Sequence, residues 1–149
     1  MHIIEAHDNI PPKADLFLAG GISNCPNWQE QAIELLGNTE GTAINPRRSE
    51  KFTEDIADEQ IAWEHQALRV CDSVIFWFPS ETLCPITLFE LGVFTQRKDT
   101  PIFVGTDLKY GRRFDVIKQL QLERPEIIVR DNVKDVIGDF IDWNKAIKS

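Results

Sequence analysis

Two glutamates of this sequence, Glu64 and Glu90, occupy positions where a helix would be expected to carry core side chains. Glu64 follows Ile61 by three residues and precedes Leu68 by four, so a helix places all three on one face. Glu90 stands inside the apolar segment ITLFELGVF, residues 86–94. Two carboxyl groups in one cleft can attack a sugar carbon and transfer a proton, as glycosidic-bond cleavage requires.

Each glutamate also has a plain structural explanation. The helix dipole would favour Glu90 in the first turn of a helix. Glu64 could pair at a helix edge with an arginine such as Arg48. Both explanations stay open for each residue taken alone, whereas the two glutamates together favour a catalytic pair.

Residues 72–92 determine where Glu90 lies. Their first part, SVIFWF at 73–78, is an uninterrupted β-branched and aromatic run, which is typical of a strand buried on both faces. Pro79 ends this strand, and Pro85 suits the first turn of the next helix. Glu90 therefore lies about one turn into a helix that begins beyond the carboxyl end of a central strand, where open α/β sheets bind their ligands.

Strands and helices alternate along the rest of the chain. The patterns predict strands at residues 15–21, 42–46, 72–78, 101–105 and 126–129. They predict helices at residues 27–36, from Thr53 or Glu54 to about 70, from 85 to about 97, at 114–122 and at 133–147. This alternation is typical of an α/β fold with a mainly parallel, five-stranded, doubly wound sheet, flavodoxin-like or Rossmann-like, whose strand order the pattern does not give.

A single domain at residues 14–149 accommodates these elements, because a chain of 149 residues is long enough for one substantial core. Residues 1–13 are expected to form an N-terminal leader or edge segment, since Pro11 and Pro12 prevent regular structure there. Ile3 and Ile4 could still add a short edge strand.

Composition excludes several classes of protein. No apolar run approaches the roughly 20 residues that cross a bilayer, and the N-terminus lacks the pattern of a signal peptide, so we expect no membrane association and a cytoplasmic location. Three cysteines without CxxC spacing predict reduced thiols and no metal site. The net charge of -8 opposes binding of a nucleic-acid polymer but leaves a small nucleotide possible.

Five short motifs, in this order, resemble the nucleoside 2-deoxyribosyltransferase family. They are FLAGGIS at 17–23, NPRR at 45–48, WEH at 63–65, CD at 71–72 and FELG at 89–92. The resemblance implies that Glu90 is a nucleophile that attacks the anomeric carbon of a 2-deoxynucleoside or its 5′-monophosphate. It implies that Glu64, eight residues before Asp72, assists by binding or protonating the base or by orienting the nucleophile. No cofactor is required.

The same resemblance and the residue types together give a set of expected substrate-binding residues. The glycine-containing loop and the Pro-Arg segment of the family correspond to Gly20, Gly21, Ser23, Pro46 and Arg47. Trp63 could stack a base, and converging arginines at positions 47, 48, 112 and 113 would favour a 5′-phosphate.

The chain departs from the family at one position. Many of these transferases carry an aspartate six residues before the nucleophile, where this chain has Cys84. Ser80 or Glu81 could replace that aspartate through a different loop path.

The sequence is compatible with three functions. They are transfer of the sugar to a second base, hydrolysis of a 2-deoxynucleoside 5′-monophosphate, and nucleotide binding without catalysis. The expected partner is a small nucleoside or nucleotide. Because family members are commonly homo-oligomers that complete each site with a neighbour's residues, we also expect a homo-oligomer.

Overall fold

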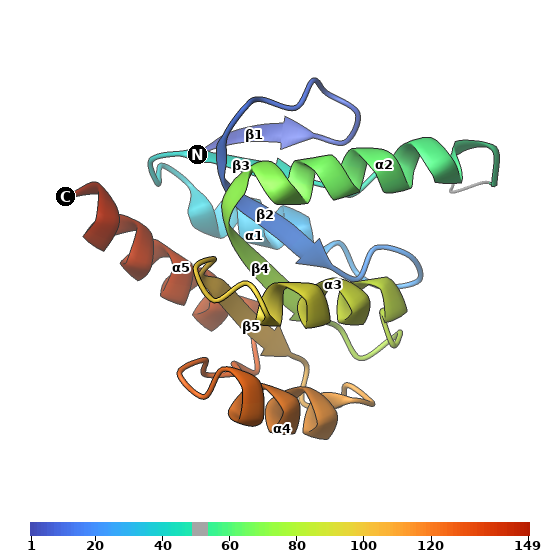
Figure 1. The fold of residues 1–149 in the computed structure, drawn as a ribbon, viewed down its shortest axis with the longest axis vertical. Coiled ribbons are helices and arrows are strands. Elements are labelled where there is room, and N and C mark those ends of the chain that lie inside the picture. Colours follow the sequence, from blue (N-terminus) through green and yellow to red (C-terminus); the bar gives the residue numbers. More distant parts are fainter. Residues whose placement is uncertain (49–53) are drawn as a thin grey trace.

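The computed structural model describes residues 1–48 and 54–149, and its parallel strands form one sheet in the order β1-β3-β2-β4-β5 (Figure 1). The strands are β1 (His2–Glu5), β2 (Ala14–Gly20), β3 (Thr42–Asn45), β4 (Cys71–Phe78) and β5 (Ile102–Thr106). The predicted α/β doubly wound architecture is therefore confirmed. Because all strands are parallel, their carboxyl ends meet at one edge of the sheet.

Helices cover both faces of this sheet (Figure 1). They are α1 (Trp28–Leu36), α2 (Glu54–Val70), α3 (Pro85–Thr95), α4 (Arg113–Glu123) and α5 (Val133–Lys148). Helices α1 and α5 pack on one face, and α2, α3 and α4 on the other. None of the helices at residues 1–48 and 54–149 is both long enough and apolar enough to cross a membrane.

The apolar run in β4 supplies both cores at once. Val74, Phe76 and Phe78 face the cluster under α2, α3 and α4. Ile75 and Trp77 face the cluster under α1 and α5. Since successive side chains of a strand point to opposite faces, a central strand covered on both sides must be apolar throughout, as the sequence predicts.

Local signals define most of the helix ends correctly. The Asn27 side chain accepts a hydrogen bond of 3.1 Å from the Glu30 backbone N–H and caps α1, and Gly37, with a φ of 49°, ends this helix. Asn132 caps α5 in the same way by accepting from Asp135. Of the two predicted starts of α2, Glu54 is its first helical residue and Thr53 lies outside the described residues.

The strand predicted at residues 126–129 is wrong. Only Arg130 pairs there, through a single bridge to Gly105. The preceding residues are held in a turn instead, because the Ile127 N–H donates to the Arg124 carbonyl and the buried Arg124 guanidinium binds the Thr100 carbonyl at 3.1 Å. The fifth strand of the sheet is β1, where Ile3 and Ile4 pair with β3.

The contact between β5 and α5 leads to a first prediction. A Cβ atom at Gly105 would overlap Val136 and lie 3.0 Å from the Trp77 ring, whereas a Cβ at Gly138 of α5 would meet nothing within 4 Å. Gly105→Ala should therefore lower the free energy of unfolding by about 1–3 kcal/mol. The control Gly138→Ala should raise it by about 0.5–1 kcal/mol, because alanine favours the helix. Urea unfolding measures both changes, and equal stability of the two variants would contradict this packing.

Candidate functional site

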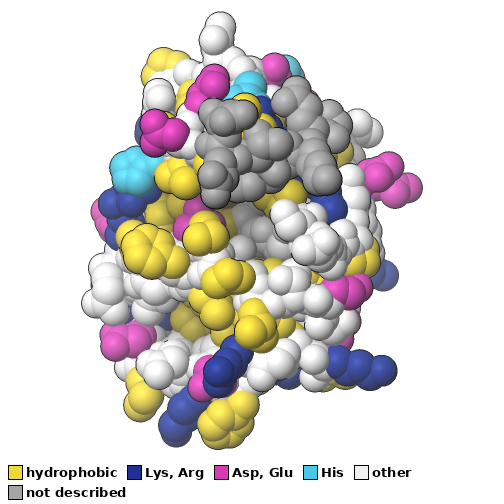
Figure 2. Space-filling model, turned by 90° about the vertical axis from the view of Figure 1, so that its right-hand side faces the viewer, with side chains coloured by type: hydrophobic (Ala, Val, Ile, Leu, Met, Phe, Trp, Pro, Cys, Tyr) yellow, Lys and Arg dark blue, Asp and Glu magenta, His cyan; other side chains and the backbone are white. Residues whose placement is uncertain are grey.

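The carboxyl ends of β3, β2 and β4 lie side by side, and the three segments that follow them form the rim of the candidate site. These segments contain most of the predicted site residues. Figure 2 looks at the molecule from the side toward which β1 and β2 run, and it shows hydrophobic side chains gathered across the middle of that face. Helices α2 and α3 border this end of the sheet in Figure 1 and carry the two glutamates.

The charge of Glu64 acts on Glu90, so the two glutamates lie within electrostatic range of each other, and their role as a catalytic pair stays a prediction. Glu90 is partly buried. Burial, followed by the charge of Glu64, raises the pKa of Glu90 to about 7, and the positive charge of Arg69 opposes the rise. A carboxyl group that titrates near neutral pH can serve as a nucleophile or exchange a proton under physiological conditions.

Glu64 is also partly buried, and burial raises its pKa. Three groups act in the opposite direction. The Gln60 side-chain amide donates a 2.6 Å hydrogen bond to Oε1 of Glu64, and the positive charges of Arg48 and His7 favour the ionised carboxylate. Glu64 is therefore held in a polar network at one end of the sheet.

The expected buried face of α2 is only partly correct. Leu68 is buried, but 62% of Ile61 is exposed. The two residues are seven positions apart, which is roughly 10 Å along a helix. Figure 1 shows that the N-terminal part of α2 extends past the ends of β1 and β2. Glu64 lies between the exposed Ile61 and the buried Leu68 along α2.

The glycines of the first loop allow a close approach between chain segments. A Cβ atom at Gly20 would lie 2.5 Å from the Trp28 ring, and one at Gly21 would lie 2.7 Å from Pro79. The Gly21 carbonyl accepts hydrogen bonds from Trp28 Nε1 and from Gln29. These contacts explain the two glycines by packing, and their role in substrate binding stays a prediction, as does that of the exposed Ser23.

Arg47, which follows the buried Pro46, holds the first loop in place. Its Nη1 donates to the Pro26 carbonyl at 3.1 Å and to the Gln29 side chain at 2.9 Å. Its Nη2 donates to the carbonyls of Ile22 and Cys25, each at 2.9 Å. Through these bonds Arg47 positions residues 22–26. Contact of Pro46 or Arg47 with substrate stays a prediction.

The arginines near α4 have their own partners. Arg113 donates to the Thr106 hydroxyl at 2.8 Å, and Arg112 forms an ion pair with Asp115 at 3.6 Å. The Arg113 bond joins the start of α4 to the end of β5, whereas the Arg112 pair is local to the start of α4.

The loop between β4 and α3 carries the departure at Cys84. This residue is buried in a left-handed conformation with a φ of 52°, and burial is the largest of the effects that raise the pKa of its thiol to about 12. The thiol is therefore uncharged at neutral pH and cannot replace a carboxylate. Ser80 donates to the Glu81 carboxylate at 3.1 Å, and the charge of Glu81 reaches Cys84, so an acidic group does lie near this position.

His7 and Gln60, which the sequence does not single out, belong to the hydrogen-bonded network around Glu64. His7 Nε2 lies 2.7 Å from Oε1 of Gln60, the residue that binds Glu64. Trp63, expected to stack a base, has its ring centroid 5.6 Å from that of His7 and donates its indole N–H to the Asp8 carbonyl. The spacing of four residues between Gln60 and Glu64 could have indicated their contact, but His7 carries no such signal.

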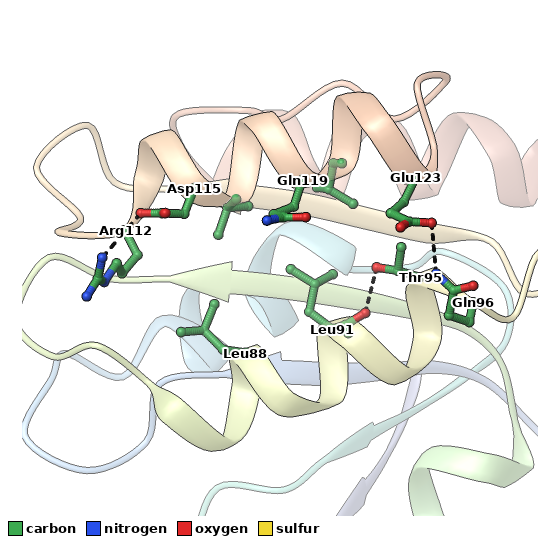
Figure 3. Close-up of a pocket in the computed structure, with 11 residues that line it drawn as sticks. Leu88, Leu91, Thr95, Gln96, Arg112, Asp115, Gln119 and Glu123 are labelled. Carbon is green, nitrogen blue, oxygen red and sulfur yellow. Dashed lines mark hydrogen bonds and ion pairs between the residues drawn. The ribbon is translucent and has the colours of Figure 1, made fainter.

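A groove of about 450 Å³ between α3 and α4 is lined by other residues than the two glutamates (Figure 3). Leu88, Leu91 and Thr95 face it from α3, and Asp115 and Gln119 from α4. Among residues 1–48 and 54–149, no group of three or more His, Cys, Asp or Glu side chains could hold a metal ion.

Residues 13–108 match the family model described as nucleoside 2-deoxyribosyltransferase like. The match extends from β2 through β5 and includes both Glu64 and Glu90. No curated protein matches the chain.

The raised pKa of Glu90 predicts a pH-dependent cost in stability. Between an unfolded pKa of 4.5 and a folded pKa of about 7, the unfolded chain loses the proton that the folded protein keeps, so stability falls as the pH rises. Above pH 7 the loss amounts to about 3 kcal/mol. Glu90→Gln should thus be more stable than wild type by up to about that amount at pH 8 and nearly equal to it at pH 4.

Thermal or urea unfolding across this pH range tests the prediction. Glu59→Gln, at an exposed position of α2, is the matched control and should not reproduce the gain. A gain for Glu90→Gln that is the same at pH 4 and pH 8 would show that Glu90 is not the group responsible.

Proposed function

Because the chain belongs to the nucleoside 2-deoxyribosyltransferase-like family, we propose that it cleaves the N-glycosidic bond of 2-deoxynucleosides or their 5′-monophosphates. The observation that supports this proposal most directly is the pair of interacting, partly buried carboxyl groups on α2 and α3. Glu90 is the nucleophile of the proposed reaction, and Glu64 is its assisting group.

In the first step, an oxygen of ionised Glu90 forms a bond to the anomeric carbon while the bond from that carbon to the base nitrogen breaks. The electron pair of the broken bond leaves with the base, which takes a proton from water. Glu64 assists by binding the base or by orienting the nucleophile. In the second step, water or another base forms a bond to the anomeric carbon while the bond from that carbon to Glu90 breaks. Glu90 is released as a carboxylate, and the attacking group loses its proton to solvent. The absence of a 2′-hydroxyl suits this route, because the oxocarbenium-like transition state is then less destabilised.

The environment of the pair supports these roles. Partial burial removes water from the Glu90 carboxylate, which leaves it more reactive once it is ionised. The charge of Glu64 adds to the effect of burial on Glu90, so Glu90 can keep its proton at a pH where an isolated carboxyl group has lost it.

Hydrolysis is the second candidate, and Cys84 is the observation that favours it. A neutral, buried thiol stands where many transferases carry an aspartate used in handling the base or the sugar. If nothing else holds an acceptor base, water completes the second step. A nucleotide-binding module without catalysis is the third candidate, which the same departure permits.

A second copy of the chain is part of the proposal. Ile86 and Phe89 of α3 are 65% and 73% exposed, and Ile61 of α2 is exposed as well. Large apolar side chains exposed on the two helices that carry the carboxyl groups are suited to an interface between copies. A homo-oligomer formed there would also exclude water from the site.

An exchange assay tests the proposed reaction. The protein is incubated with a 2-deoxynucleoside and a second free base, and chromatography detects free base and exchanged nucleoside. Transfer yields the exchanged nucleoside, and hydrolysis yields free base and deoxyribose alone.

Glu90→Ala should lower kcat by at least about 10⁴-fold, as loss of a covalent nucleophile does, while the exposed Glu59→Gln leaves it unchanged. Turnover that survives in Glu90→Ala would overturn the assignment.

The pH dependence of the reaction gives an independent check. Because Glu90 must be ionised, kcat/KM should rise about tenfold per pH unit in acid and level off above about pH 7. Glu64→Gln should shift this rise to lower pH, since the charge that raises the pKa of Glu90 is gone. An acid limb that keeps its position in Glu64→Gln would contradict the proposed coupling.

A further inference from the structure

The N-terminal segment of this chain reaches the candidate site through one tight turn. After β1, the Asp8 N–H donates to the Glu5 carbonyl, and the Asp8 carboxylate accepts from the Glu5 N–H, each at 3.0 Å. His7 lies inside this turn with a φ of 72°, a left-handed conformation that costs a non-glycine residue about 1 kcal/mol. Such a conformation persists where neighbouring contacts hold it, and here they come from α2.

The contact between His7 and α2 continues to Glu64. His7 Nε2 lies 2.7 Å from Gln60 Oε1, and Gln60 Nε2 lies 2.6 Å from Glu64 Oε1. Gln60 is 4% exposed, so its amide has little freedom to find water instead. An ionised carboxylate only accepts hydrogen bonds, which requires the Gln60 amide nitrogen to face Glu64 and its oxygen to face His7. His7 Nε2 must then carry a hydrogen and donate it.

Two further contacts fasten the same turn. The Trp63 indole N–H donates to the Asp8 carbonyl at 3.0 Å, and the Trp63 ring packs against His7. On the other side, Asn45 at the end of β3 donates to the Glu5 carboxylate at 3.1 Å and accepts from the Arg47 N–H at 3.0 Å. The turn therefore connects the Glu64 helix with the segment that holds the first loop.

These residues precede the part of the chain that matches the family model. The family match begins at residue 13, whereas β1 and the turn that carries His7 precede it. The segment extends the sheet beside β3 and places a side chain on the network of Glu64.

We propose that His7 is a positioning residue which, through Gln60, fixes the orientation of the Glu64 carboxyl group for the reaction. The inference rests on the proposed function for its catalytic consequence, and on the hydrogen-bonded series His7, Gln60, Glu64 for its geometry. In this arrangement His7 touches no reacting atom. It holds the Gln60 amide in the one orientation that binds the carboxylate.

Titration of Glu64 tests the geometry without any requirement for activity. The charged groups that act on Glu64 are Arg48 after β3, His7 in the turn, and Glu90 of α3. With ¹³C-labelled glutamate side chains, NMR gives the pKa of Glu64 in wild type and variants. His7→Ala and Gln60→Ala should each raise it, because each removes support from the ionised form. His2→Ala, an exposed histidine of the same segment, is the control and should leave it unchanged.

The double variant His7→Ala/Gln60→Ala shows whether His7 affects Glu64 through Gln60 or independently of it. His7 also acts on Glu64 directly through electrostatics, and that part of its effect persists without Gln60. If His7 acts through Gln60 as well, His7→Ala should change the pKa of Glu64 less in a Gln60→Ala background than in wild type. An undiminished effect in that background would overturn the proposal, as would an unaltered pKa in His7→Ala itself. His7→Gln, which keeps a side-chain donor, covers the case in which the alanine variant does not fold, and it should restore part of the wild-type value.

Kinetics then test the catalytic consequence. His7→Ala should lower kcat between about 10- and 100-fold with little change in KM, as a misoriented group does, while His2→Ala keeps the wild-type rate. Failure of the proposed function would appear as absence of turnover in wild type with the NMR shifts intact. Failure of this inference would appear as wild-type turnover with a Glu64 that does not respond to His7.

Discussion

Burial and the nearby charge of Glu64 raise the pKa of Glu90 to about 7, and the rest of the fold must offset the free energy of keeping these two carboxyl groups together. The structure does so with a sheet whose central strands are buried on both faces. Because residues 74–78 of β4 are apolar and buried, polar chemistry is displaced from the sheet to the loops and helices beyond its carboxyl edge. The same hydrophobic strand that stabilises the core thus determines where the carboxyl groups can lie.

Close packing at two glycines and hydrogen bonds from one arginine hold the first loop at the rim of the site. Gly20 and Gly21 let the first loop lie against Trp28 and Pro79 at distances that no Cβ atom would permit. Arg47 then binds four acceptors of that loop and of α1, so a charged residue at the sheet edge acts as a structural clamp. A substitution of Arg47 would therefore change both the conformation of the first loop and the charge at the edge of the sheet.

The sequence predicts those features that depend on neighbours in the chain. The strand at 73–78, the Asn27 cap and the position of Glu90 follow from local periodicity and capping, and the structure has them. Features that depend on distant partners were missed. The segment 126–129 has the composition of a strand, but the buried Arg124 and its turn hold it away from the sheet. Ile61 has the spacing of a buried helix position, but its side chain is exposed. The contact of His7 with Gln60 joins residues 53 positions apart, which no local pattern encodes.

The N-terminal segment couples the stability of the sheet to the geometry of the site. Strand β1 covers the edge of β3 that would otherwise present unpaired backbone groups, and the turn that follows it binds α2 through His7 and Asp8. Removing the whole segment would therefore disturb the sheet edge and the Glu64 network together, and a loss of activity would not tell which one matters. A change confined to the His7 side chain leaves the β1 pairing in place, because that pairing uses only backbone atoms of residues 2–5. A side-chain substitution can therefore remove the contact with the Glu64 network while β1 still covers the edge of the sheet.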